Sequence, residues 1–186
     1  MKKFTIFFLF FILSINNNAQ ILNKDDGMVN LGMGMGAYYG NGNGFKIDVP
    51  PIYGSYEYMI DDNISVGGFM AYMHASYNLS SIYDPYKISW NYSYFNISAL
   101  GNYHFYNTDK LNAYGGLKLG YTNITANYGS NDSEVNQILN DYDSESSGIL
   151  FGFQIGGRYF FTESLAFNME LGYGIALLKG GLTFKF

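Results

Sequence analysis

The chain ends with Gly-Leu-Thr-Phe-Lys-Phe, residues 181–186, and this stretch indicates the fold. Its apolar residues Leu182, Phe184 and Phe186 alternate with polar ones. In a β-strand, successive side chains point to opposite faces, so this alternation places the three apolar side chains on one face. The stretch therefore predicts a strand that separates an apolar environment from a polar one.

The same period of two recurs along most of the chain and is weakest at residues 64–79. We expect eight strands, at residues 28–39, 52–60, 64–79, 89–106, 111–121, 151–161, 165–173 and a terminal strand that ends at Phe186. The connections alternate between short and long: 61–63, 107–110 and 162–163 are short, whereas 40–51, 80–88 and 129–147 are long, and a brief one lies near 175–180. An even number of strands with alternating connection lengths is typical of an antiparallel membrane barrel.

Composition agrees with a membrane location. The chain has 19 Tyr and 16 Phe, and its aromatic content is 19%. Tyrosine is enriched at membrane interfaces, where its ring is in an apolar layer and its hydroxyl is in water. Beyond the N-terminal region, no apolar run is long enough for a transmembrane helix. A strand protein in lipid must close its sheet, because an open edge would leave backbone groups without partners.

The N-terminus has the anatomy of an export signal. Lys2 and Lys3 precede an apolar segment at residues 4–15, and Ala19 suits the position before a cleavage site. We expect residues 1–19 to be a signal peptide and residues 20–186 to form the barrel domain. The full chain has a net charge of −5, and loss of the two lysines with the signal makes it −7. This acidic balance argues against a nucleic-acid partner.

Taken together, these features resemble the small eight-stranded outer-membrane barrel proteins of OmpA/OmpX type. The resemblance implies an all-β, eight-stranded antiparallel transmembrane up-and-down barrel in the outer membrane of a Gram-negative bacterium, surrounded by outer-membrane lipid. It also implies insertion by the barrel-assembly machinery, which reads a C-terminal aromatic strand; Leu182, Phe184 and Phe186 match that assembly signal. Members of the group stabilise the envelope, act as adhesins or occasionally are enzymes, so the resemblance leaves the function open.

A soluble eight-stranded ligand carrier would instead point its apolar face inwards. The apolar face here is almost free of charge and is ringed by tyrosine, which favours lipid outside. The polar face would then line the lumen, and it carries five charged residues: Glu57, Lys118, Arg158, Glu170 and Lys185. An eight-stranded lumen is only wide enough for side chains, so we expect these charges to pair and to plug it. An Arg158–Glu170 ion pair, diagonal across neighbouring strands, is expected within this network.

We therefore expect a non-enzymatic outer-membrane barrel that needs no cofactor or metal and whose outer loops contact surfaces or an unidentified extracellular partner. Two alternatives stay open. One is a deacylase-like, lipid-modifying enzyme built on His74 and Ser76, in which Asp84 could complete the set; His74 and Ser76 are expected to point into the lumen. The other is a narrow, porin-like pore for small solutes.

The longest loop is acidic. Asp141, Asp143 and Glu145 alternate there, and carboxylate oxygens of this kind can bind Ca²⁺. The spacing lacks the turn glycine and ligand pattern of an EF-hand, so a solvated acidic loop is the simpler interpretation.

Export and cleavage give the first testable expectation. The mature protein should begin at Gln20 and should fractionate with the outer membrane. N-terminal sequencing or the intact mass of the purified protein measures this directly. Recovery of the uncleaved chain from the inner membrane would contradict it.

Overall fold

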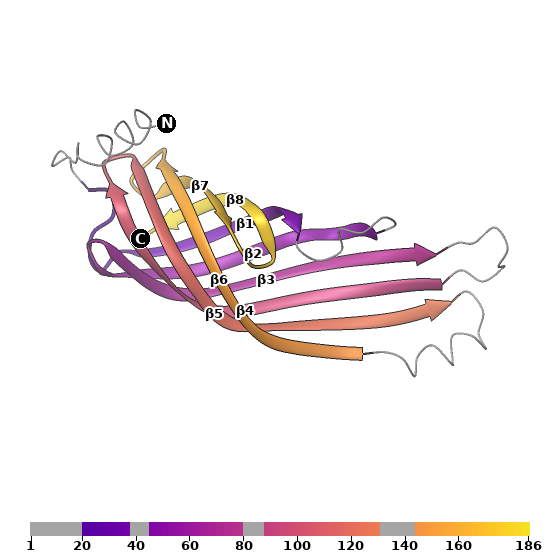
Figure 1. Ribbon diagram of the computed structural model, residues 1–186. Helices are drawn as coiled ribbons and strands as arrows, with labels where there is room; N and C mark the ends of the chain where they lie inside the picture. Colours follow the sequence, from indigo (N-terminus) through magenta and orange to yellow (C-terminus); the bar gives the residue numbers. More distant parts are fainter. Residues whose placement is uncertain (1–19, 38–44, 80–87, 131–143) are drawn as a thin grey trace, which may run out of the picture.

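The computed structural model describes residues 20–37, 45–79, 88–130 and 144–186 (Figure 1). In these residues, eight antiparallel strands form a closed barrel in which each strand pairs with its neighbours in the chain and β1 also pairs with β8. The strands are β1 (Gly27–Ala37), β2 (Phe45–Asp61), β3 (Ile64–Leu79), β4 (Ile88–Asn107), β5 (Leu111–Ser130), β6 (Ser144–Phe160), β7 (Leu165–Gly172) and β8 (Ala176–Lys185). The described part of the chain contains no helix that is long and apolar enough to cross a membrane. The predicted fold class is confirmed.

The seam between the first and the last strand ends at the C-terminal residue. Gly27 and Phe186 exchange two backbone hydrogen bonds, of 2.9 and 3.0 Å. The Phe186 ring lies against Gly27, where an added Cβ would come within 2.7 Å of it, and stacks on Tyr56 with ring centroids 6.4 Å apart. The predicted apolar face of the terminal strand points outward, with Leu182, Phe184 and Phe186 all exposed on the outer wall.

The short connections lie where they were predicted, but several strands are longer than the sequence suggested. β2 begins at Phe45, β5 continues to Ser130 and β6 begins at Ser144, so parts of the predicted loops 40–51 and 129–147 are strand. The added parts of β5 and β6 are rich in Ser, Asn and Gly, and residues 45–51 contain two prolines, all of which favour loops in a reading based on composition. Outside lipid, a strand needs no continuous apolar face, and its backbone pairing with a neighbour is enough to maintain it.

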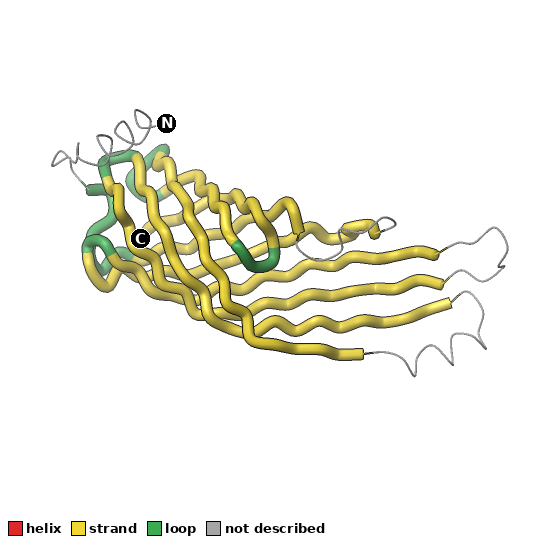
Figure 2. Tube along the Cα trace, viewed as in Figure 1, coloured by secondary structure: helices red, strands yellow, loops and turns green. Residues whose placement is uncertain are grey.

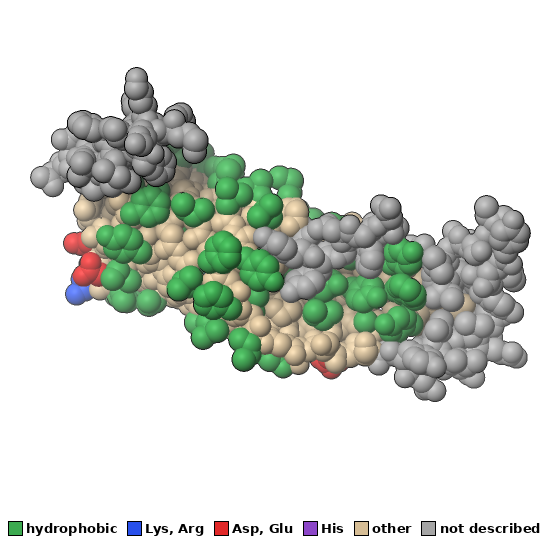
Figure 3. Space-filling view, viewed as in Figure 1, with side chains coloured by type: hydrophobic (Ala, Val, Ile, Leu, Met, Phe, Trp, Pro, Cys, Tyr) green, Lys and Arg blue, Asp and Glu red, His purple; other side chains and the backbone are tan. Residues whose placement is uncertain are grey.

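An apolar belt surrounds the barrel. Figure 3 shows hydrophobic side chains spread over the visible part of the outer wall. Exposed members of the belt include Leu31, Met33, Met70, Ile97, Leu117, Leu119, Phe153, Ile155, Met169, Leu171 and Leu182. Exposed tyrosines flank it, with Tyr58, Tyr103 and Tyr159 towards the short turns and Tyr72, Tyr121 and Tyr173 towards the other end. This is the arrangement that a lipid bilayer requires of a barrel surface.

Charged side chains in the described residues avoid this belt. They fall into three groups, which are listed here: near the short turns, Lys24, Asp25, Asp26, Asp61, Asp62, Asp109, Lys110 and Glu163; at the far ends of β2 and β6, Lys46, Asp48 and Glu145; and facing inwards, Glu57, Lys118, Arg158, Glu170, Lys179 and Lys185. The lipid-facing surface is therefore uncharged.

The strands differ greatly in length. β7 and β8 have 8 and 10 residues, whereas β4 and β5 have 20 each. About 9–11 residues of a tilted strand cross a bilayer, so the long strands continue well beyond it. Figures 1 and 2 show the strands β3–β6 projecting past the β7–β8 hairpin, on the side opposite to the short turns. We call this part the sheet extension, and it comprises residues 45–51, 73–79, 88–94, 122–130 and 144–151.

Apolar clusters lie at both ends of the lumen. At the turn end, the N-terminal segment folds beneath the barrel, where Leu22 is fully buried with Met28, Met59 and Phe160. Asn107 clamps this segment, because its side chain accepts from the Leu22 N–H at 3.3 Å and donates to the Leu22 carbonyl at 2.7 Å. At the other end, the β7–β8 turn places Ile175 in a second cluster, which contains Tyr53, Phe69, Ala71, Met73, Tyr94, Leu100 and Ala176.

The seam predicts a role for the last side chain. Replacing Phe186 by Asp should lower the yield of folded barrel and leave unassembled protein in the periplasm, because a charge would then face lipid at the closing pair. Heat-modifiable migration on unboiled gels measures the folded fraction. The matched variant Phe186→Tyr keeps an aromatic ring at the interface and should assemble normally. Equal assembly of both variants would contradict a role for this residue.

Candidate functional site

Glu57 is the centre of the largest polar cluster in the lumen. Its carboxylate accepts hydrogen bonds from four buried side chains, one each from β1, β3, β4 and β6. Asn30 and Asn102 each donate at 2.8 Å, Ser65 donates at 2.9 Å, and the Arg158 guanidinium forms an ion pair with it. A buried carboxylate is stable only when paired in this way.

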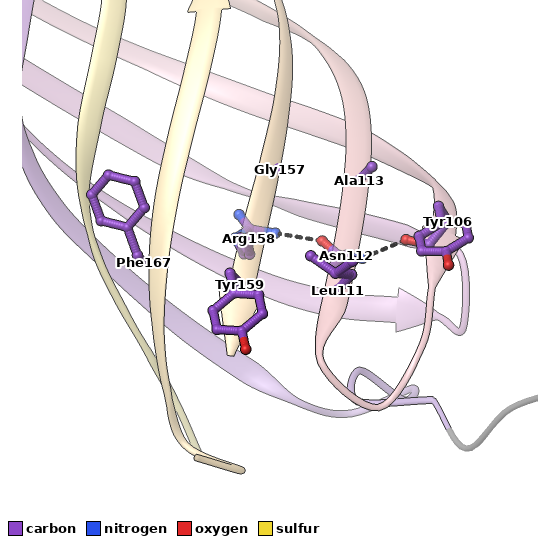
Figure 4. Close-up of a pocket in the computed structure, with 8 residues that line it drawn as sticks. All are labelled: Tyr106, Leu111, Asn112, Ala113, Gly157, Arg158, Tyr159 and Phe167. Carbon is purple, nitrogen blue, oxygen red and sulfur yellow. Dashed lines mark hydrogen bonds between the residues drawn. The ribbon is translucent and has the colours of Figure 1, made fainter. Parts of the chain in front are cut away.

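Arg158 extends from β6 into the lumen and is itself fully buried. It donates a second hydrogen bond to Asn112 at 3.3 Å, and its guanidinium lies 4.2 Å from the centre of the Tyr114 ring. Figure 4 shows the bond between Arg158 and Asn112 and the further bond from Asn112 to the backbone carbonyl of Tyr106. His104 also belongs here, because its ring nitrogens lie 3.0 Å from Asn112 Oδ1 and 2.9 Å from Ser65 Oγ.

The same region of the wall has a hollow on its outer side, of about 250 Å³. Exposed Leu111, Tyr159 and Phe167 border it, and the small residues Ala113 and Gly157 are directly paired within it (Figure 4). Its border is apolar, so it is a depression suited to lipid chains and offers little for polar chemistry.

Glu170 is the centre of the second cluster. Lys179 forms an ion pair with its carboxylate, Tyr114 donates to it at 2.6 Å, and the Lys118 ammonium lies 3.8 Å away. Gln154 links the two clusters, because it lies 3.5 Å from Lys179 Nζ and donates at 2.8 Å to Asn102, which in turn bonds Glu57. Glu57, Arg158, Glu170 and Lys179 therefore belong to one hydrogen-bonded network, and Lys118 lies beside it.

A chain of neutral side chains completes this network. Tyr53 donates to Asn168 at 2.6 Å, Asn168 to Thr183 at 3.0 Å, and Thr183 to Asn30 at 2.6 Å. Asn30 then bonds Glu57, so polar contacts run around the lumen through β1, β2, β7 and β8. The sequence reasoning did not assign these residues, although asparagine at alternate inward positions was a usable signal.

Residues 5–185 match the family model described as outer membrane protein beta-barrel domain. The chain belongs to this family. Its location is accordingly the bacterial outer membrane, and the short turns of such a barrel face the periplasm. A search of curated proteins gave no match.

Several solved β-barrel structures share the fold. Ail, the attachment invasion locus protein of Yersinia pestis, in a complex with the heparin analogue sucrose octasulfate, has a TM-score of 0.54 at 14% identity, with 88% of this chain and 99% of that chain covered. OprG from Pseudomonas aeruginosa has a TM-score of 0.53 at 16% identity, with 88% and 97% covered. The N-terminal barrel domain of OprF from the same organism gives 0.50 at 17%, with 89% and 100% covered.

For this outer-membrane barrel, the predicted Arg158–Glu170 ion pair is wrong. Arg158 pairs with Glu57 instead, and Glu170 pairs with lysines. Glu170 does lie opposite Gly156, as expected, but the Tyr114 ring occupies the space above that glycine, where a Cβ would come within 2.7 Å of it. The prediction considered neighbouring strands only, whereas side chains in so narrow a lumen reach the opposite wall.

Two lysines also differ from expectation. Lys179 was not assigned, because residues 175–180 were predicted to be a connection, and β8 in fact begins at Ala176. Lys185 lies at the periplasmic rim, where it donates to the Ile21 carbonyl at 2.8 Å and pairs with Asp26 at 3.3 Å. It makes no contact with the central network among the described residues.

The candidate hydrolytic set does not assemble in the lumen. His74 lies on the outward face of β3 with the exposed Met70 and Tyr72, and its Nδ1 is 3.0 Å from the Ser93 hydroxyl. The expectation that His74 and Ser76 point inwards is therefore wrong; both faces of this strand are partly apolar, which obscured the alternation. Asp84 lies outside the described residues.

The possible cation site is also mostly outside the described residues, since only Glu145 of its three members is described. Glu145 accepts a hydrogen bond from Asn123 at 2.6 Å on the outer wall. Within the described ranges, no group of three His, Asp or Glu side chains is placed to hold a metal ion.

The observed pairing predicts a strong energetic coupling between Glu57 and Arg158. Replacing Glu57 by Gln should cost roughly 3–5 kcal/mol of unfolding free energy, because it leaves a buried guanidinium without its charge partner. In a double-mutant cycle with Arg158→Met, the double variant should lose much less than the sum of the two single losses. Urea unfolding in lipid vesicles measures all four proteins. A second double-mutant cycle, with Arg158→Met and Glu170→Gln, serves as the control. A larger coupling energy in this second cycle than in the Glu57–Arg158 cycle would contradict the observed arrangement.

Proposed function

We propose that the protein is a non-enzymatic outer-membrane barrel, closed to solutes, that uses its sheet extension to contact partners outside the cell. The observation that carries this proposal is the edge of β6 in the extension, which has no partner strand among the described residues. Residues 144–151 of β6 pair with β5 on one side, but β7 ends at Gly172 and pairs only from Gln154 onwards. Exposed strand edges present free N–H and C=O groups to which an extended segment of a partner can bind.

The extension has a second edge on β2, and the two edges differ. Residues 45–51 of β2 have no β1 partner, since pairing with β1 begins at Ile52. Pro50 and Pro51 interrupt this edge, and the register with β3 shifts at the same place. Proline cannot donate a hydrogen bond and is a common device for blocking strand addition. No proline interrupts the β6 edge, and Ile149 there is 83% exposed, so β6 is the better edge for a partner.

Charge indicates which partners would fit. The extension and the three long connections that join its strands carry seven carboxylates, at Asp48, Asp84, Asp132, Glu134, Asp141, Asp143 and Glu145, and only two lysines, at Lys46 and Lys87. Ail binds a sulfated heparin analogue in its crystal. An acidic surface repels such polyanions and favours neutral or basic partners instead.

The contents of the lumen support a closed barrel. An ion-paired network spans its centre, and apolar clusters around Leu22 and Ile175 lie at the two ends. An eight-stranded barrel has no room for an open channel beside such packing. The contacts of His74 and Ser76 give the lipid-modifying alternative less support, because His74 Nδ1 lies 3.0 Å from the Ser93 hydroxyl and the Ser76 hydroxyl donates to Asp48.

Removal of the signal after Ala19 also belongs to this proposal. The buried Ile21 and Leu22 follow the expected cleavage site directly, so a chain that begins at Gln20 would retain the periplasmic cap.

Strand addition at β6 predicts a selective effect of one substitution. Nanodisc-embedded protein should bind neutral or basic peptides in an immobilised panel, and Ile149→Lys should weaken that binding at least about tenfold, because a charge on an edge strand discourages strand pairing. The matched control is Thr125→Lys, which adds the same charge to β5, whose backbone is paired on both sides. Binding restricted to sulfated glycans, or equal loss in both variants, would contradict the proposal.

A closed lumen predicts no steady conductance in planar bilayers. The combined substitution of Glu57, Arg158 and Leu22 by Ala should produce channels, because it removes the central ion pair and the periplasmic cap. The control substitutes Lys46 and Asp48, an ion pair outside the lumen with a 3.0 Å separation, and should stay silent. Single-channel recording distinguishes these cases, and open channels in the unmodified protein would instead support a solute pore.

A further inference from the structure

A small cavity lies between the outer end of the charged network and the apolar cap. Lys118, Lys179 and Asn96 line it, together with Phe69, Leu150 and Ile175. The space open to the centre of a water-sized particle is about 10 Å³, so the cavity can hold one water molecule or one small ion. The β7–β8 turn covers it, and a Cβ added at Gly174 in that turn would meet nothing within 4 Å.

Lys118 reaches this cavity, and among the described residues no carboxylate lies within hydrogen-bond distance of its ammonium group. Its side chain is only 5% exposed, and its ammonium is 3.8 Å from the Glu170 carboxylate, which is too far for a hydrogen bond. Lys179 occupies the close position on the same carboxylate oxygen. The Lys118 ammonium also lies 3.7 Å from the centre of the Phe69 ring. Three N–H donors are therefore buried with weak compensation.

The neighbouring wall adds further unused polar groups. Asn96 Nδ2, Asn96 Oδ1, Ser98 Oγ and Thr122 Oγ1 are buried and have no hydrogen-bond partner in the described residues. Asn96 is paired with Thr122 across β4 and β5, and Ser98 follows on the same inward face. Buried polar atoms without partners are uncommon and usually mark an unassigned ligand or water.

The charge of the lumen favours a bound ligand over a water molecule at this cavity. Among the buried side chains of the described residues, three cations (Lys118, Lys179 and Arg158) face two carboxylates (Glu57 and Glu170). Lys185 and Asp26 compensate one another separately at the rim. When all five groups are ionised, one positive charge is left over, and an anion can neutralise it whereas a water molecule cannot. Uncompensated buried charge is strongly destabilising.

We propose that the lumen binds one small monovalent anion, of halide size, between Lys118, Lys179 and Asn96. The lysine ammonium groups supply the charge, and the Asn96 amide can donate a further hydrogen bond. A metal cation would meet two lysines and is excluded by repulsion. Larger anions such as gluconate do not fit the volume. The anion is a buried structural ligand, separate from partner contact at the sheet extension.

The test compares folding in different sodium salts at equal ionic strength. Protein refolded into vesicles in sodium chloride or bromide should be more resistant to urea than protein refolded in sodium gluconate. Once the site approaches saturation, a tenfold increase in chloride should raise the folding equilibrium constant by about tenfold. Lys118→Met should abolish the difference between chloride and gluconate. Lys185→Met, which removes a lysine from the rim, should retain it.

Crystals of the unmodified protein grown in bromide give a readout that does not depend on the folding of any variant. Anomalous scattering should place a bromide peak within contact of Lys118 Nζ and Asn96 Nδ2. The proposal is overturned if the site shows water and no anomalous peak, or if stability in chloride and gluconate is the same.

Discussion

Backbone hydrogen bonding in lipid is the constraint on which this structure depends. No water is available in the bilayer to satisfy a free strand edge, so the sheet has to close on itself. The pairing of β1 with β8 achieves this and runs from Met28 opposite Lys185 to Ala37 opposite Ala176. The exchange of backbone bonds between Gly27 and Phe186 extends it to the final residue. Once the barrel is closed, its outer face must be apolar, and the polar faces of the strands have only the lumen left.

The narrow lumen then determines which inward side chains are compatible with one another. Eight strands leave room for side chains and little else, so residues from opposite walls are in direct contact. Arg158 on β6 can reach Glu57 on β2, and the aromatic ring of Tyr114 fits only because Gly156 opposite to it has no side chain. Charge is tolerated in this space as a connected network, since an isolated carboxylate or guanidinium would cost several kcal/mol.

The sequence predicted the strands, the short turns and the outward face of the terminal strand, because a period of two reports directly on which residues share a face. It could not predict partners across the lumen: alternation says that Arg158 and Glu170 both point inwards, but it does not say which side chain lies opposite each of them. It also failed where both faces of a strand are partly apolar, as around His74, and where strands leave the membrane and lose their apolar face, as in β5 beyond Tyr121. Lys179 was missed because its strand begins directly after a turn of only three residues.

The short β7–β8 hairpin explains two features that would otherwise be unrelated. Because β7 ends at Gly172, its turn stays at the level of the lumen, and Ile175 can fold inwards over the charged network. For the same reason, β6 loses its neighbour and continues alone on that side, which exposes residues 144–151 along one edge. Lengthening the hairpin would pair the β6 edge and would also lift Ile175 away from the mouth of the barrel. The closed lumen and the open edge are thus two consequences of one difference in strand length.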